Sequence, residues 1–395
     1  MKSSNYKYLI MITLIVCGIS NIYFQFMMTP VSEQIKAMYN LNQVQYSTLF
    51  TAPMAPAIFI SLICGIIIDR FGARKVVLVS LIVASCGIWG RVFTTNFAVL
   101  YLCMMVPGFA ATFLNTSNAK LYGEWFDPSK ISTVMGIHMG MSSLGNACAI
   151  YTTAMLPSVK TGYVISAVIS TAAVLLWLFF YRSNADKSSR SSQAADSVVS
   201  NIKTVFRTRD IIVAGIALLC SYGCFMSVST FCPQVLQYKG FSAVTAGKIA
   251  AVVSLGQCVG NFTSPLIAAR VGNLKKVLIG MTAVSVLSIF SITFARSAVL
   301  LVLLLFLAGY TGGGVVPLYL SMPVKLKQIG TRLAGTAGGT IATFELAGAV
   351  LIPSYVIAAI AGDRMNMYYV LAPVIGIISI LLLTRLSHEV ELQKS

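Results

Sequence analysis

Apolar runs of about 20 residues, long enough to cross a bilayer as helices, follow one another along most of this chain. The strands of a membrane barrel would instead alternate in hydrophobicity over segments of ~10 residues. Only 10% of the residues are charged and 57% are hydrophobic, although a soluble domain carries about 25% charged residues. The sequence therefore predicts an all-α integral membrane protein, because backbone polar groups in lipid must be satisfied inside helices.

The apolar runs predict twelve membrane-spanning helices. They are expected at residues 8–28, 44–68, 76–95, 97–121, 130–156, 162–181, 210–232, 242–269, 276–295, 297–322, 331–358 and 365–386. The first run follows Lys2 and Lys7 as a signal peptide would, but it lacks a small-residue cleavage site. We therefore expect it to be retained as the first helix.

The 28 Lys and Arg residues are distributed unevenly over the predicted loops. If both termini are cytosolic, 21 of them fall on the cytosolic side and 7 on the other side. Positively charged loops stay on the cytosolic side of a membrane. This count predicts a multi-pass protein of the cell membrane with cytosolic termini. The net charge of +17 is then an orientation signal, and no nucleic-acid partner is expected.

A short charged turn occurs twice in the chain. The first copy reads Gly65-Ile-Ile-Ile-Asp69-Arg70-Phe71-Gly72-Ala73-Arg74-Lys75, and the second reads Pro265-Leu-Ile-Ala-Ala269-Arg270-Val271-Gly272-Asn273-Leu274-Lys275. Pro107-Gly108 and Ala308-Gly309 form a second, rougher match. A Ser-rich stretch between the copies has the composition of a flexible linker. We therefore expect a six-helix bundle at 1–181, a cytosolic linker at 182–209 and a second six-helix bundle at 210–395.

The first copy of the turn resembles the hallmark motif of the major facilitator superfamily, Gly-x-x-x-Asp-(Arg/Lys)-x-Gly-x-(Arg/Lys)-(Arg/Lys). Every fixed position is matched, by Gly65, Asp69, Arg70, Gly72, Arg74 and Lys75. The resemblance implies a transporter of twelve helices in two pseudo-symmetric six-helix bundles. It also implies that this turn is a conformational latch on the cytosolic side. Arg270 and Gly272 form the weaker second copy of the latch, in which Ala269 stands in the Asp position.

Departures from family signatures bear on the substrate. Many proton-coupled members carry an Arg four residues before a Gly in helix 4, where this chain has Met104. Drug exporters carry a Gly-Pro pair in helix 5, which is absent from residues 140–145. The run Trp125-Phe126-Asp127-Pro128 before a glycine-rich helix looks more like the branch that handles small organic or inorganic anions. The specific signatures of nitrate porters and oxalate–formate exchangers are absent.

Glu345 is the leading candidate for coupling, because an ionisable residue inside a membrane is costly and is a functional candidate by default. It lies 14 residues past Thr331. That distance corresponds to about 21 Å along a helix, near the middle of the bilayer. Glu345 could carry a proton or bind a cationic group of a substrate. The alternative is a structural Glu that bonds to a neighbouring helix.

Two further ionisable candidates lie within predicted helices. His138, about 12 Å into its helix, could titrate or donate to an anion, and a satisfied packing histidine is an equal alternative. Arg91 lies beside Trp89 near the outer end of its helix. We expect its side chain to reach the membrane interface, with attraction of substrate as the second interpretation.

The resemblance implies a cavity lined mainly by the first, fourth, seventh and tenth helices. Polar or aromatic residues expected to lie mid-span there are Asn21, Tyr23, Gln25, Asn115, Tyr222, Gln257, Asn261 and Tyr310. Side chains of these types also join helices to one another. The run Gly309-Tyr310-Thr311-Gly312-Gly313-Gly314, before Pro317, is expected to bend its helix.

The sequence thus favours a secondary active transporter of a small organic anion or metabolite, working by proton coupling or exchange. The alternative is efflux of hydrophobic or cationic compounds in exchange for protons. A membrane enzyme is not favoured, because the chain has only two His and no metal-ligand spacing or nucleophile–base set. We expect no catalytic residues, metal or cofactor. The expected partners are a small-molecule substrate, the lipid bilayer and a proton or counter-solute, and the expected state is a monomer.

Overall fold

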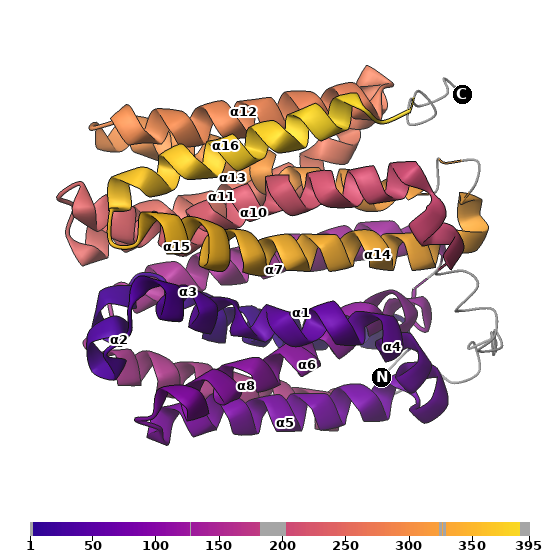
Figure 1. The fold of residues 1–395 in the computed structure, drawn as a ribbon. Coiled ribbons are helices and arrows are strands. Elements are labelled where there is room, and N and C mark those ends of the chain that lie inside the picture. The colour runs from indigo at the N-terminus through magenta and orange to yellow at the C-terminus, as the bar shows by residue number, and fades with distance from the viewer. Residues whose placement is uncertain (1–2, 127, 182–202, 324–325, 327–328, 388–395) are drawn as a thin grey trace. The chain divides into compact units, whose positions relative to one another are not determined.

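The computed structural model describes residues 3–126, 128–181, 203–323, 326 and 329–387 (Figure 1). Ten helices in these ranges are long and apolar enough to cross a membrane. The chain divides into two compact units, one made of Met1–Leu41 and Leu49–Ser192 and the other of Asn42–Thr48 and Gln193–Ser395. The predicted linker at 182–209 lies largely outside the described residues.

The helices that precede the linker belong to the first unit, apart from the start of α3. They are α1 (Ser3–Phe26), α2 (Ser32–Tyr39), α3 (Gln43–Thr51), the 3₁₀ turn η1 (Ala52–Met54), α4 (Ala55–Phe71), α5 (Ala73–Phe93), α6 (Phe97–Gly123), α7 (Pro128–Thr153) and α8 (Val159–Phe180). Helix α1 packs against α7 and α8, α5 packs against α6 and α8, and α4 packs against α6. Apolar side chains of these helices form one core, which includes Leu14, Val77 and Trp177.

The second unit repeats this arrangement. It contains α10 (Arg209–Tyr238), α11 (Ala243–Val271), α12 (Leu274–Phe294), α13 (Ala298–Ser321), α14 (Gly330–Val350), the π-helix η4 (Leu351–Ile357), α15 (Ala358–Ala361) and α16 (Met365–Thr384). Helix α10 packs against α14 and α16, α12 packs against α13 and α16, and α11 packs against α13. These are the same pairings, in the same chain order, as in the first unit, as a sequence repeat requires.

The expected helix at 44–68 is not continuous, and the prediction of one uninterrupted helix was wrong. It is divided into α3, η1 and α4, because Pro53 and Pro56 lack the N–H groups that an α-helix needs. The expected helix at 331–358 likewise changes to a π-helix at Leu351, two residues before Pro353. The short helix α2 was not predicted, since its mixed polar sequence has no apolar run.

The start of α3 belongs to the second unit and makes buried polar contacts with it. The Gln43 amide donates to Gln234 Oε1 on α10 over 2.9 Å. Ser47 Oγ lies 2.8 Å from the hydroxyl of Ser354, which belongs to the π-helix. The chain therefore leaves the first unit after Leu41, before α3 begins, and returns to it within α3 at Leu49.

Each unit contains a close helix crossing at a glycine, where no other residue would fit. A Cβ placed on Gly108 of α6 would lie 1.9 Å from the carbonyl oxygen of Pro53. A Cβ on Gly309 of α13 would lie 2.0 Å from the carbonyl oxygen of Val253 on α11. Small residues let helices approach this closely in membranes. The two crossings lie at matching positions of the repeat, as the pairing of Pro107-Gly108 with Ala308-Gly309 predicts.

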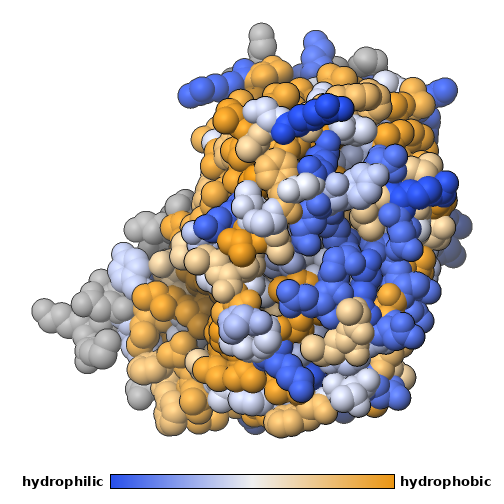
Figure 2. Space-filling view, turned by 90° about the vertical axis from the view of Figure 1, so that its left-hand side faces the viewer, coloured by the Kyte–Doolittle hydropathy of each residue, from blue (hydrophilic) through white to orange (hydrophobic). Residues whose placement is uncertain are grey.

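Large apolar side chains are exposed along the outside of many of the helices, among them Phe59, Phe93 and Val299. Figure 2 looks onto the end of the helices where α2 lies, and hydrophilic side chains gather there with hydrophobic ones beside them. Apolar flanks and polar ends suit helices that cross a lipid bilayer.

Candidate functional site

His138 is held at the centre of a small polar cluster in the first unit. Its side chain is 4% exposed. Ring atom Nε2 lies 3.2 Å from the Asn118 amide nitrogen, and Nδ1 lies 2.9 Å from the Tyr122 hydroxyl, both on α6. The ring packs against Gly18 of α1, where a Cβ would lie 3.2 Å from it. Helices α1, α6 and α7 together fix the orientation of the imidazole.

Both ring nitrogens of His138 therefore have partners, as a packing histidine would. The Asn118 amide nitrogen can only donate, so Nε2 accepts, and the proton of the neutral ring lies on Nδ1, which donates to the Tyr122 hydroxyl oxygen. The Asn118 Oδ1 atom is buried and has no hydrogen-bond partner among the described residues. A role for His138 in coupling stays a prediction.

The other candidates of the first unit divide into two groups. The Tyr23 hydroxyl lies 2.8 Å from Thr152 Oγ1 on α7, and the Gln25 amide donates to the Phe50 carbonyl over 2.9 Å. These two side chains join helices to one another. Asn21 is 8% exposed, and its Nδ2 makes no hydrogen bond within the described part of the chain. Asn115 is exposed.

Glu345 lies on α14, which packs against α10 in the second unit. Its side chain is partly buried, and it is close enough to interact electrostatically with the phenol of Tyr222 on α10. Among the residues that the structure describes, no cation and no hydrogen-bond donor pairs with its carboxylate. A role for Glu345 in coupling or in substrate binding stays a prediction.

Three further candidates of the second unit lie on α11 and α13, which pack closely together. Gln257, Asn261 and Tyr310 are all partly buried. The Tyr310 hydroxyl accepts a hydrogen bond from Thr263 Oγ1 over 3.0 Å. Gln257 packs over Gly313, where a Cβ would lie 2.4 Å from its side chain. Polar groups therefore stand along one helix pair.

His138 and Glu345 occupy equivalent helices of the two units. His138 is on α7, which packs against α1, and Glu345 is on α14, which packs against α10. His138 faces Gly18 of α1, and Phe344, next to Glu345, faces Gly215 of α10. The repeat thus brings one ionisable side chain per unit to the same kind of helix contact.

Arg91 is fully buried, so the expectation that it reaches the membrane interface was wrong. One terminal nitrogen donates to the Phe24 carbonyl over 2.6 Å, and the other donates to Ser166 Oγ. The guanidinium carbon lies 4.5 Å from the ring centroid of Tyr163. A carbonyl, a hydroxyl and an aromatic face take the place of water around this charge.

No Asp or Glu of the described residues forms an ion pair with Arg91. Tyr39 on α2 is close enough to interact with it. Burial raises the pKa of the Tyr39 phenol, and the charge of Arg91 opposes that shift only in part. Tyr39 therefore stays neutral at physiological pH. Among the described residues of this unit, no carboxylate neutralises the Arg91 charge.

Arg91→Lys is expected to lower the free energy of unfolding by about 2 kcal/mol. A Lys ammonium cannot bridge Phe24 and Ser166 while lying flat on Tyr163. Thermal unfolding of the purified protein in detergent measures the effect. The exposed Arg296→Lys change is the control, expected to stay within ~0.5 kcal/mol. Equal midpoints for the two variants would show that the bridging geometry of Arg91 is unimportant.

Both charged turns depend on glycine for their backbone. Gly72, between α4 and α5, has φ +83°, and Gly272, after α11, has φ +70°, a region that other residues rarely adopt. Arg70, Arg74, Lys75 and Arg270 are exposed. The side chain of Asp69 and the surroundings of Gly65 lie outside the described part of the structure. The latch function stays a prediction.

Two repeated bundles of membrane-length helices, with ionisable and amide side chains held inside them, are the architecture of a membrane transporter. The family model described as the Major Facilitator Superfamily matches residues 14–353. The chain therefore belongs to this superfamily. It is an all-α, multi-pass membrane transporter and not an enzyme.

Individual relatives are distant. The chain is 22% identical over 293 residues to NiaP of Bacillus subtilis, named for niacin and nicotinamide transport, covering 73% of this chain and 72% of that protein. It is 26% identical over 350 residues to SauU of Cupriavidus necator, named for sulfoacetate transport, covering 80% and 79%. The solved structure of the nucleoside transporter NupG has a TM-score of 0.80 at 13% identity, over 95% of this chain and 99% of that one. This last similarity concerns the fold alone.

Proposed function

We propose that this transporter moves a small organic anion across the cell membrane together with a proton, which binds to Glu345. The observation that carries the proposal is the partly buried Glu345 carboxylate, which has no cation beside it in the described residues. A charge inside a membrane protein is costly unless it is paired. A proton removes that cost, so Glu345 is suited to load and release one during each cycle.

Proton and anion binding support each other in this scheme. An anion bound in the same protein repels a charged Glu345 and is tolerated when Glu345 is neutral. Each ligand then raises the affinity for the other by the same factor. This linkage is what symport requires.

Two observations in the first unit favour an anionic substrate. Arg91 keeps a buried positive charge without an acidic partner in the described part of the chain. The Nδ2 atom of Asn21 is a buried donor without an acceptor there. NiaP is named for niacin and nicotinamide and SauU for sulfoacetate; niacin and sulfoacetate carry an acidic group, and nicotinamide does not.

Alternating access with cytosolic termini completes the proposal. The bundles at 1–181 and 210–395 would move relative to each other, and the turn from Gly65 to Lys75 would latch the cytosolic side. The second candidate function is export of cationic compounds in exchange for protons. The Glu345 carboxylate, which has no cation beside it among the described residues, supports this function as well, since it could hold a cation directly.

Uptake of labelled niacin by liposomes that contain the purified protein tests the function. A medium one pH unit more acidic than the lumen supports at most an about tenfold accumulation for one proton and one monovalent anion. We expect accumulation under this gradient and its loss with a protonophore. Labelled sulfoacetate serves as the second probe. Acid-driven movement of a cationic dye, without transport of either anion, would favour the export function instead.

A further inference from the structure

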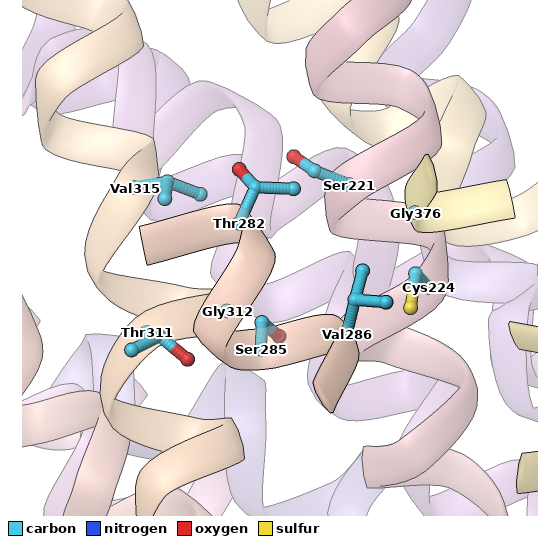
Figure 3. A pocket seen from close by; sticks show the side chains of 9 residues that line it. All are labelled: Ser221, Cys224, Thr282, Ser285, Val286, Thr311, Gly312, Val315 and Gly376. Atoms are coloured by element: carbon cyan, nitrogen blue, oxygen red, sulfur yellow. The ribbon is translucent and has the colours of Figure 1, made fainter. Parts of the chain in front are cut away.

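A small cavity inside the second unit is lined by hydroxyl groups. It measures about 10 Å³ and lies among α10, α12, α13 and α16 (Figure 3). Its lining includes Ser221 on α10, Thr282 and Ser285 on α12, and Thr311 on α13. No acidic or basic side chain lines it. The space is the size of one water molecule.

Two of these hydroxyls make no hydrogen bond within the described residues. They belong to Ser221, which is 6% exposed, and Thr282, which is 2% exposed. The Tyr319 phenol is close enough to interact with Ser221, but its hydroxyl makes no hydrogen bond there either. Figure 3 shows the side chains of Ser221 and Thr282 next to each other at the cavity. Buried hydroxyls without a partner are unfavourable, and most find one in protein or ordered water.

Other hydroxyls of the same helices bond to their own backbone instead. Ser227 donates to the Gly223 carbonyl, Ser288 to that of Val284 and Thr311 to that of Leu307, each over 2.7 Å. This contact four residues back is the usual one in helices. The carbonyl four residues before Ser221, that of Ala217, instead accepts from Ser379 over 2.7 Å. The Ser221 hydroxyl is thereby left for the cavity.

We propose that this cavity binds one water molecule that bridges Ser221 Oγ on α10 and Thr282 Oγ1 on α12. Water both donates and accepts, as the two hydroxyls do, and Thr311 Oγ1 keeps lone pairs for a third contact. A cation would lack any carboxylate here and would be left uncompensated. The water holds α10 against α12 and α13. Tyr222 directly follows Ser221 in the chain, and Tyr310 directly precedes Thr311, so both tyrosines are next to the helix contacts that the water stabilises.

A double-mutant cycle in thermal unfolding tests the shared water. Ser221→Ala and Thr282→Val are each expected to lower the Tm by about 2–4 °C. The double variant is expected to lower it no further than the larger single change, because the water is lost with its first partner. Ser227→Ala and Ser288→Ala, which change back-bonded hydroxyls of the same two helices, form the control pair and should be additive. Additive effects for Ser221 and Thr282 as well would overturn the proposal.

Two direct measurements complete the test. An experimental structure detailed enough to resolve waters should contain one within 2.7–3.2 Å of both hydroxyls, and lose it in Ser221→Ala. An empty cavity would contradict the proposal. The Tm should be the same in sodium chloride and choline chloride. A higher Tm in sodium chloride that disappears in Ser221→Ala would show that the cavity binds a cation and not a water molecule.

Discussion

Glu345→Gln is expected to abolish proton-driven accumulation of substrate while leaving the protein folded. Gln has the shape of a protonated Glu but cannot release a proton. Under a gradient of one pH unit, accumulation should fall from a limit of about tenfold to none, the level set by the substrate gradient alone. Exchange of internal for external substrate needs no net proton movement, and we expect it to persist.

The comparison of these two assays in the same liposomes identifies the cause. Loss of both would indicate a damaged binding site rather than lost coupling. Asp363→Asn is the control, because it removes an exposed carboxylate outside the long helices. Glu345→Gln protein that still accumulates substrate with normal pH dependence would exclude Glu345 from the coupling role.

Gly309→Ala is expected to destabilise the second unit by at least ~3 kcal/mol. The added methyl group would lie 2.0 Å from the Val253 carbonyl oxygen, and a backbone atom cannot move aside without separating α11 from α13. Gly256 and Gly260 of α11 make similar contacts with the carbonyls of Phe306 and Tyr310. The helix pair therefore has no room for a side chain at this crossing. A lower yield of monodisperse protein and a lower Tm in detergent are the readouts.

Gly280→Ala provides the matched control for this change. Gly280 is exposed on α12, and nothing lies within 4 Å of a Cβ placed there. Alanine favours the helix over glycine by about 1 kcal/mol, so this variant should be as stable as the parent or more stable. Alanine has the same helix-propensity advantage at Gly309, so any loss of stability in Gly309→Ala is caused by the contact with the Val253 carbonyl. Equal stability of both variants would disprove the tight crossing.

The membrane-spanning fold could be predicted from the sequence because apolar length and charge act locally along each helix. The interruptions of the helices were harder to predict. A proline such as Pro53 or Pro353 can interrupt a membrane helix in several ways. Only the packing around it decides between a 3₁₀ turn and a π-helix. The burial of Arg91 was missed because its acceptors, Phe24 and Ser166, are distant in sequence and one is a backbone carbonyl.

The sequence shows which residues are of a type that could form a site, but it does not show the hydrogen-bond partners that surround each of them. Glu345 and His138 were selected for the same reason, yet the Glu345 carboxylate lacks a partner in the described residues and the His138 ring has two. The partners of His138, Asn118 and Tyr122, carry no signal that separates them from other polar residues of α6. The hydroxyl-lined cavity draws on four helices, and no local pattern reveals it.

The matching glycine crossings at Gly108 and Gly309 have a consequence for how a protein of this design can diversify. Both halves keep the same close helix contact, while the ionisable group next to the repeated α1–α7 and α10–α14 contacts differs, a histidine in one and a glutamate in the other. The glycines that permit the close helix packing are thus at different positions from these two ionisable groups. In the proposed mechanism, substitutions at the ionisable positions would change what is carried and leave the helix packing intact.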